Sequence, residues 1–241
     1  MRTVAIVQAR TGSTRLPGKV LKDLAGEPML ARVVRRLGRA RTLDGVWIAT
    51  TTAPDDERLV ALCEDRGWRY VRGSEPDVLD RYYKTARAAE ADVVVRITSD
   101  CPLIDPDVVD RVVIALREGD GLAYSSNTVP VRTFPRGLDS EAFHMAALED
   151  AWAEAESASD REHVTPFLWR QPERFPQANV MASDDFSHHR WTVDTEEDYT
   201  LVRRIFGHLG HDAFGWREVL ELVEKHPEWR KLNEHVEQKA I

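Results

Sequence analysis

The stretch VQARTGSTRLPGKVL, residues 7–21, decides the fold, because it follows the apolar run Val4–Val7. That run predicts a buried first strand, since consecutive apolar residues leave no polar face for solvent. The loop after it carries three cations, Arg10, Arg15 and Lys19, together with glycines and hydroxyl side chains. Backbone amides and cations both bind phosphate oxygens, so the loop predicts a site for a polyphosphate.

The known phosphate motifs do not describe this loop. The spacing from Gly12 to Lys19 differs from GxxxxGK[ST], and no GxGxxG follows the first strand. A loop rich in Arg, Gly and Pro can also be a solvated turn. Three cations this close to the end of a buried strand favour a phosphate site over that alternative.

Length, composition and charge limit the classes of function. The 241 residues and 42% hydrophobic content suffice for one α/β domain with a sizeable core. The net charge of -8 argues against a general nucleic-acid or membrane-surface binder, so the ligand of the basic loop should be small. The two cysteines lack CxxC spacing, which predicts no zinc site and fits a reducing compartment. The sequence has no signal-peptide pattern and no long apolar stretch, so we expect a cytoplasmic protein. We expect Cys63 and Cys101 to be buried.

The order of apolar runs and helical patterns predicts a single doubly wound, mainly parallel α/β sheet. Apolar runs at 4–7, 46–49 and 93–97 alternate with helical patterns at 28–40, 55–67, 77–90 and 106–118. This pattern covers the first half, about 1–118, of one domain, 1–241. In the second half, about 119–241, prolines and glycines break the pattern, and we expect residues 125–143 to form a lid or arm over the site. Further helices are expected at 144–157, 159–170, from the Thr195 cap to about 207, and at 215–225.

Carboxylates follow the strand ends, where ligands of open α/β sheets bind. Asp100 comes directly after the strand at 93–97 and is placed to hold a divalent cation; the alternative is a turn cap. Asp105 precedes a proline and is better explained as a helix cap. Asp194 follows the strand-like RWTV, and spacing alone leaves its role open. One or two carboxylates plus substrate phosphates suit Mg²⁺.

Two further groups of polar residues are candidates for reading substrates, and an ordinary structural role is the open alternative for each. The first group follows a third strand-like segment and suits a base or ribose edge: Arg72, Ser74, Asp80 and Arg81. The second group lies in or beside the loosely patterned half and suits a hydroxylated or carboxylated acceptor: Asn127, Arg136, Asp139, Glu141 and His163. The neighbouring His188 and His189 are expected at the surface rather than in a metal site.

Six motifs, in order, carry a resemblance that covers nearly the whole chain: AIVQARTGSTRLPGKVL at 5–21, GSEPDVLDRYY at 73–83, RITSDCPLIDP at 96–106, PRGLDSEAF at 135–143, DREHVTPFLW at 160–169 and RWTVDTEEDYTLV at 190–202. They resemble the cytidylyltransferases that make CMP-activated acidic sugars, namely the acylneuraminate and KDO cytidylyltransferases. The resemblance is strongest to their relatives of the spore coat polysaccharide biosynthesis type. Residues 160–169 differ from the acidic-sugar enzymes, so the acceptor stays open.

The resemblance implies a Rossmann-like nucleotidyltransferase fold and a Mg²⁺-dependent transfer of CMP from CTP to an acidic sugar or related small acceptor, with release of pyrophosphate. It implies that Asp100 and Asp194 hold Mg²⁺ and that residues 125–145 form a homodimer contact. The expected nucleotide contacts of the first loop and of the central strand end are Ala9, Arg10, Gly12, Ser13, Arg15, Lys19 and Ser99. The expected catalytic group is Arg10, Arg15, Lys19 and Asp100. Ser99 stands where the acidic-sugar enzymes typically have glycine, which indicates an altered nucleotide pocket.

A glycosyltransferase that uses a nucleotide-sugar donor is the alternative function, because its nucleotide-binding fold is similar. No DxD metal motif stands at the end of the fourth strand, which disfavours this alternative. A nucleotide-binding subunit without activity is a further alternative, and the presence of both cations and carboxylates argues against it.

Overall fold

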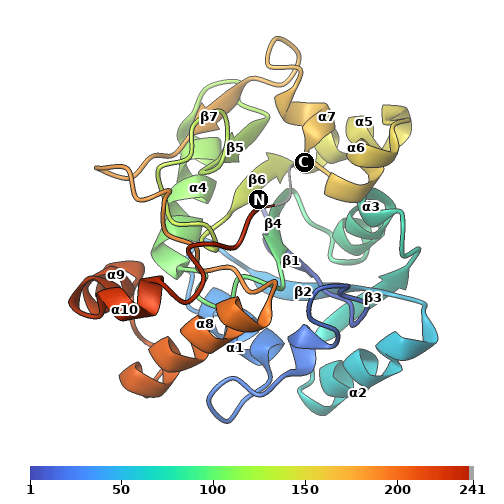
Figure 1. Ribbon diagram of the computed structural model, residues 1–241. Helices are drawn as coiled ribbons and strands as arrows, with labels where there is room; N and C mark the ends of the chain where they lie inside the picture. The colour runs from blue at the N-terminus through green and yellow to red at the C-terminus, as the bar shows by residue number, and fades with distance from the viewer. Residues whose placement is uncertain (239–241) are drawn as a thin grey trace.

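A seven-stranded sheet forms the centre of the computed structural model, which describes residues 1–238 (Figure 1). The strands are β1 (Thr3–Gln8), β2 (Gly45–Thr51), β3 (Arg69–Gly73), β4 (Val93–Thr98), β5 (Tyr124–Ser126), β6 (Glu141–His144) and β7 (Gln177–Asn179), in the order β3-β2-β1-β4-β6-β5-β7. β1 pairs in parallel with β2 and β4, whereas β6 is antiparallel to β4 and β5. The predicted mainly parallel sheet is confirmed.

Helices cover both faces of the sheet, because β1 is apolar on both sides. Ala5 and Val7 belong to one hydrophobic cluster and Val4 and Ile6 to the other, as the two-residue period of a strand requires. The first cluster includes side chains of α1 (Met29–Leu37), α2 (Glu57–Asp65), α4 (Pro106–Glu118), α8 (Glu196–Leu209) and α9 (Trp216–Lys225). The second includes side chains of α3 (Val78–Ala88), α5 (Met145–Glu154) and α7 (Pro166–Trp169). Short helices η1 (Lys19–Leu21), η2 (Pro54–Asp56), α6 (Ala158–His163) and α10 (Pro227–Arg230) complete the chain (Figure 1).

The helix caps predicted at Asp105 and Thr195 are confirmed. Asp105 Oδ1 accepts from the backbone N–H groups of Asp107 and Val108 at the start of α4, and its Oδ2 accepts from Trp216 at 2.7 Å. Thr195 begins α8 in a reciprocal capping box with Asp198. Both cysteines are buried, as expected.

Two structural predictions are wrong. The helix expected at 159–170 is interrupted, and α6 and α7 are separate, because Val164 has a φ of 73° and Pro166 has no N–H to continue the ladder. The lid expected at 125–143 instead contributes most of β5 and β6 to the sheet, and Phe134 and Leu138 within it are fully buried. A dimer contact through residues 125–145 stays a prediction. Among residues 1–238, no helix has the length and apolar character needed to span a bilayer.

Candidate active site

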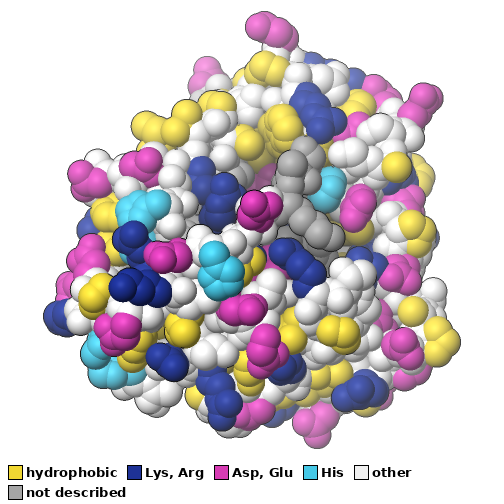
Figure 2. Space-filling model, viewed as in Figure 1, with side chains coloured by type: hydrophobic (Ala, Val, Ile, Leu, Met, Phe, Trp, Pro, Cys, Tyr) yellow, Lys and Arg dark blue, Asp and Glu magenta, His cyan; other side chains and the backbone are white. Residues whose placement is uncertain are grey.

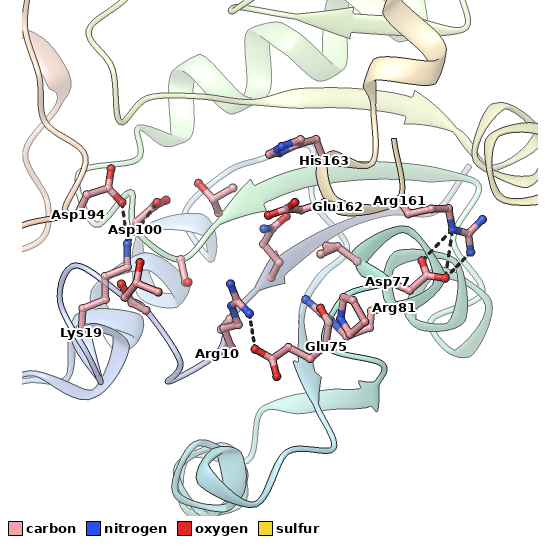
Figure 3. A pocket seen from close by; sticks show the side chains of 18 of the residues that line it. Arg10, Lys19, Glu75, Asp77, Arg81, Asp100, Arg161, Glu162, His163 and Asp194 are labelled. Carbon is pink, nitrogen blue, oxygen red and sulfur yellow. Dashed lines mark hydrogen bonds and ion pairs between the residues drawn. The ribbon is translucent and has the colours of Figure 1, made fainter. Parts of the chain in front are cut away.

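The carboxyl ends of β1 and β4 open into a cavity of about 750 Å³ (Figure 3). The two strands are neighbours, with Gln8 opposite Thr98, so the loop after β1 and the segment after β4 meet as predicted. The loop after β3, helix α6 and Asp194 supply the remaining walls. On the face seen in Figure 2, Lys and Arg side chains lie near the centre, although the chain as a whole is acidic. We call the cavity at the ends of β1 and β4 the nucleotide cavity, because residues that the sequence analysis expects to contact a nucleotide line it.

Lys19 lies between two carboxylates at one end of the nucleotide cavity (Figure 3). Its Nζ is 3.0 Å from Asp194 Oδ1 and 3.5 Å from Asp100 Oδ2, and it donates to the carbonyl of Val193 at 2.7 Å. Burial lowers the pKa of Lys19, but the charges and hydrogen bonds of the two carboxylates outweigh burial and raise it above its ordinary value. The ammonium group is therefore charged at neutral pH and fixed in direction.

Asp194 contacts two further cations. Arg15 Nη2 lies 3.0 Å and Arg190 Nη2 lies 2.9 Å from its Oδ2. Burial raises the pKa of Asp194, whereas Lys19 and the two arginines lower it, and the net effect is a pKa below the ordinary aspartate value. The carboxylate is ionised throughout the neutral range.

Asp100 and Asp194 present oxygen atoms to one region of the cavity, because they share the Nζ of Lys19. Nowhere in residues 1–238 do three or more His, Cys, Asp or Glu side chains cluster so that they could hold a metal without other ligands. Mg²⁺ is typically held by one or two carboxylates, with phosphate and water oxygens as its other ligands. The donor set of Asp100 and Asp194 fits that cation.

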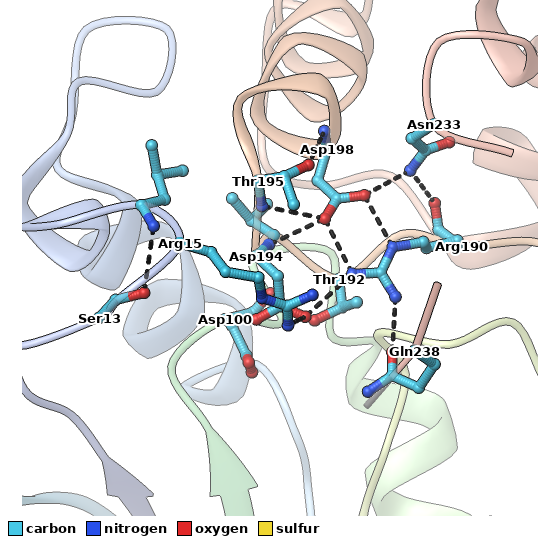
Figure 4. A network of polar contacts seen from close by, with 12 residues as sticks. Ser13, Arg15, Asp100, Arg190, Thr192, Asp194, Thr195, Asp198, Asn233 and Gln238 are labelled. Carbon is cyan, nitrogen blue, oxygen red and sulfur yellow. Dashed lines mark hydrogen bonds and ion pairs between the residues drawn. The ribbon is translucent and has the colours of Figure 1, made fainter. Parts of the chain in front are cut away.

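A buried network fixes the backbone at Asp194 (Figure 4). Asp198 Oδ2 accepts from the N–H groups of Asp194 and Thr195 at 3.0 and 3.1 Å, and Arg190 donates to both oxygens of Asp198 at 2.8 and 2.9 Å. Asn233 Nδ2 donates to Asp198 Oδ1 at 2.7 Å. Asp198 has no exposed surface, so its charge is compensated entirely by these groups. Asp194 is thus positioned by α8 and the C-terminal segment, and no strand ends at it.

The opposite wall consists of the loop after β3 and helix α6 (Figure 3). Arg10 pairs with Glu75, and Arg161 makes a two-pronged ion pair with Asp77, with Nη2 to Oδ2 at 2.6 Å. Asp77 also caps α3, so one carboxylate ties α6 to the start of α3. Burial lowers the pKa of His163, whose imidazole is therefore neutral at neutral pH.

A family model described as cytidylyltransferase matches residues 4–238. The chain belongs to the cytidylyltransferase family. SpsF, the spore coat polysaccharide biosynthesis protein of Bacillus subtilis, is 32% identical over 92% of this chain and 94% of that protein. An uncharacterized protein of Methanocaldococcus jannaschii is 35% identical over 100% of this chain and 98% of that protein. The structure of a cytidylyltransferase from Leptospira borgpetersenii superimposes with a TM-score of 0.91 at 29% identity, covering 100% of both chains.

These findings confirm the predicted family and fold, and they make the chain a CTP-dependent nucleotidyltransferase. They give no support to the glycosyltransferase alternative. The cytidylyltransferase brings most of the predicted nucleotide, catalytic and metal residues to one cavity: Ala9, Arg10, Ser13, Arg15, Lys19, Arg81, Ser99, Asp100 and Asp194. Gly12 lies in the same loop, where a Cβ would stand 3.6 Å from Glu75 Oε1.

Three predicted base or ribose contacts do not line the nucleotide cavity of the cytidylyltransferase. Arg72 is within β3, donates to the carbonyl of Thr51 and pairs with Glu57. The carbonyl of Ser74 accepts from Arg81, and its hydroxyl oxygen accepts from the N–H of Asp77. Asp80 pairs with Lys84 and accepts from the indole of Trp152. A contact of these three side chains with the nucleotide stays a prediction without support from their positions.

Of the predicted acceptor residues, only His163 lines the nucleotide cavity. Asn127 is buried between the carbonyl of Leu138 and the N–H of Ser140. Glu141 is buried with Arg96, Tyr124 and Thr165 as partners. Asp139 pairs with Arg132, and Arg136 lines a separate cavity. Acceptor binding by these four residues stays a prediction.

The sequence analysis did not single out Glu75, Asp77, Arg161 or Glu162, which line the nucleotide cavity. They lie in the motifs at 73–83 and 160–169. The resemblance therefore pointed to these two segments but gave these four side chains no role. The partners Asp77 and Arg161 are 84 positions apart, and no local pattern joins them.

Proposed function

We propose that the cytidylyltransferase transfers CMP from CTP to a hydroxyl group of a small acidic sugar or related acceptor, and releases pyrophosphate. The observation that carries the proposal is the carboxylate pair Asp100 and Asp194. Both carboxylates contact Lys19, and the other cations of the first loop line the same cavity. The name of SpsF, a spore coat polysaccharide biosynthesis protein, supports a sugar as acceptor.

The triphosphate of CTP binds at the end of the cavity where Arg15, Lys19 and the backbone of the first loop gather. Arg15 and Lys19 contribute permanent positive charge, and the contacts with Asp194 and Val193 hold both groups in place before the ligand arrives. Preorganised charge of this kind stabilises the negative charge that develops on departing pyrophosphate. When Mg²⁺ is bound by Asp100 and Asp194, it supplies charge neutralisation and alignment for displacement at the α-phosphorus.

The remaining walls accommodate the other two parts of the reaction. Arg10 and Arg81 hold the loop that includes Glu75, at the end of the cavity assigned to the cytidine. His163 and Glu162, on α6, lie on the wall assigned to the sugar. A neutral imidazole accepts a proton from an attacking hydroxyl, so His163 is suited to general-base work.

The proposal is tested by identifying the products by ³¹P NMR. CTP, Mg²⁺ and a panel of sugar acids, sugar phosphates and neutral sugars are incubated with the enzyme. We expect pyrophosphate and a CMP-linked sugar, no reaction after metal removal by EDTA, and a loss of at least about 10²-fold in kcat/KM for Asp100→Asn. Release of CDP or CMP without pyrophosphate would contradict the proposal.

The matched control is Asp107→Asn, which makes the same change on an exposed side chain of α4. We expect it to retain wild-type kcat/KM. Stabilisation by each nucleoside triphosphate with Mg²⁺, measured by thermal shift, tests base selectivity, because a ligand that binds only the folded state raises the melting temperature. Equal shifts with all four nucleotides would contradict selectivity for CTP.

A further inference from the structure

A second cavity, of about 250 Å³, lies next to the nucleotide cavity. Arg190 lines this second cavity and donates through Nη2 to Asp194, which lines the nucleotide cavity, and through Nη1 to Gln238, which lines the second (Figure 4). The paired side chains of Arg190 and Asp194 therefore lie between the two spaces. We call the smaller space the cationic cavity.

The cationic cavity has an excess of positive charge. Arg136, Arg190, Arg230 and two histidines line it, and Glu234 is the one acidic side chain on its wall within residues 1–238. Arg190 is compensated by Asp194 and Asp198. Neither Arg136 nor Arg230 has a carboxylate partner in the part of the chain that the structure describes. Burial lowers the pKa of Arg136, and the charges of Arg132 and Arg190 lower it further, against an opposing effect of Asp139.

His189 adds a buried nitrogen that lacks a partner. The side chain is 3% exposed, and its Nδ1 makes no hydrogen bond to any of the described residues. The sequence analysis placed both histidines at the surface, which is wrong for His189, because residues 188–189 lie outside any strand and the ring packs between His188 and Trp191. Burial first, and then His188 and Arg230, lower the pKa of His189 to about 4. A buried polar atom without a partner is costly unless a ligand satisfies it.

The backbone holds these groups rigidly with respect to each other. Arg136 N–H donates to the carbonyl of His189 at 3.0 Å, and Trp191 N–H donates to the carbonyl of Arg136 at 2.7 Å. Asn233, at 2% exposure, donates to the carbonyl of Arg190 at 3.0 Å. The backbone that bears Arg136, His189 and Arg190 is thus held in place by its own hydrogen bonds, so a ligand does not have to order it.

We propose that the cationic cavity binds an oxyanion, and that this oxyanion is the acidic group of the acceptor whose hydroxyl reacts in the nucleotide cavity. The inference rests on the proposed function. A guanidinium group matches the oxygens of a carboxylate or phosphate, and Arg136 and Arg230 offer such donors without competing carboxylates. An acceptor that places its acidic group in the cationic cavity and its hydroxyl in the nucleotide cavity spans the Arg190–Asp194 pair, and an enzyme that binds it in this way selects acidic sugars over neutral ones.

The first experiment detects the anion without catalysis. The ring signals of His189, assigned with His189→Gln, are followed by ¹H NMR while inorganic phosphate is added to the full-length protein. We expect saturable shifts and a rise in the pKa of His189, because a bound anion stabilises the imidazolium. The response should be lost in Arg136→Gln, be partly restored in Arg136→Lys, and persist in Arg58→Gln, an exposed charge change on α2. No response in the wild type, or an equal response in Arg136→Gln, overturns the proposal.

The second experiment separates an acceptor group from a free anion. With an acidic acceptor, we expect Arg136→Gln to raise its KM at least about tenfold and to change the KM of CTP less than about twofold. If phosphate binding depends on Arg136 but the acceptor KM does not change, the cavity serves a free anion and the assignment to the acceptor is overturned. If no acceptor reacts with the wild type, the proposed function fails, while the phosphate titration still decides whether the cavity binds an oxyanion.

Discussion

A single methyl group added at Gly137 should disturb the backbone of Trp191 and Thr192, which precedes Asp194 in the chain. Its φ is +106°, a conformation that favours glycine, and a Cβ there would stand 2.6 Å from the carbonyl carbon of Trp191 and 2.7 Å from the nitrogen of Thr192. Both are backbone atoms, so they cannot rotate away. Backbone strain alone costs about 1–3 kcal/mol, and separating the two segments adds to it. We expect Gly137→Ala to lower the free energy of unfolding by about 3 kcal/mol or more.

The assay is thermal unfolding followed by far-UV circular dichroism, with Gly207→Ala as the matched control. For a chain of this size, 1 kcal/mol corresponds to about 2–4 °C, so Gly137→Ala should melt about 6–12 °C below the wild type. Gly207 is an exposed residue of α8 with nothing within 4 Å of the added Cβ. There the same change should raise the melting temperature, by up to about 4 °C, because alanine favours the helix. Equal melting temperatures for the two variants would refute the reasoning.

Three further predictions concern buried charge and buried thiols. Asp198→Ala removes one of the two carboxylates that compensate the buried Arg190, together with the acceptor of the Asp194 and Thr195 N–H groups, and should cost about 3–5 kcal/mol in urea unfolding. Glu196→Ala breaks the exposed pair with Lys22 and should cost less than about 1 kcal/mol in the same assay. Similar losses in the two variants would contradict the role of burial. Burial raises the pKa of both cysteine thiols, that of Cys63 to about 11, so neither should react with iodoacetamide at about pH 8 until the chain unfolds, as mass spectrometry can check. The pKa of Lys19 is raised in the folded protein. Its ion pairs therefore contribute fully to the free energy of unfolding at any pH below the ordinary lysine pKa of about 10.4. This contribution is lost as the pH rises through the pKa of Lys19 in the folded protein. The difference in melting temperature between wild type and Lys19→Met should therefore be constant from about pH 5 to pH 9, and a halving within that window would count against the assignment.

The fold could be predicted in large part because its signals are local. The buried strands β1 and β4 are short apolar runs, and two of the helices begin at caps that the neighbouring residues identify, Asp105 and Thr195. The antiparallel strands β5 and β6 were not predicted, because they have three and four residues and are interspersed with turns. A proline and a left-handed residue divide the helix expected at 159–170, and sequence shows the proline but not the backbone angle of Val164.

That the loop after β1 and the segment after β4 meet could be predicted, because their residues follow two adjacent strands directly. For the polar residues of the second half, the sequence could not distinguish ligand-binding side chains from structural ones. A polar residue whose hydrogen bonds are made inside the core is of the same residue type as one that binds a ligand. Asn127 and Glu141 illustrate this, because their partners Leu138 and Arg96 lie on other segments of the fold. Asp194 lies in the same cavity as Asp100, as predicted, but its position depends on Arg190 and Asp198, which no strand pattern indicated.

The central claim is that Asp100 and Asp194 together hold the divalent cation of a CTP complex. Its most direct test is electron paramagnetic resonance of Mn²⁺, as a substitute for Mg²⁺, titrated with the protein in the presence and absence of CTP. We predict tight Mn²⁺ binding that requires CTP, at least about tenfold weaker binding in Asp100→Asn and in Asp194→Asn, and wild-type binding in Glu162→Gln, which changes a carboxylate on the opposite wall. Wild-type affinity for Mn²⁺ and CTP in both aspartate variants would contradict the account.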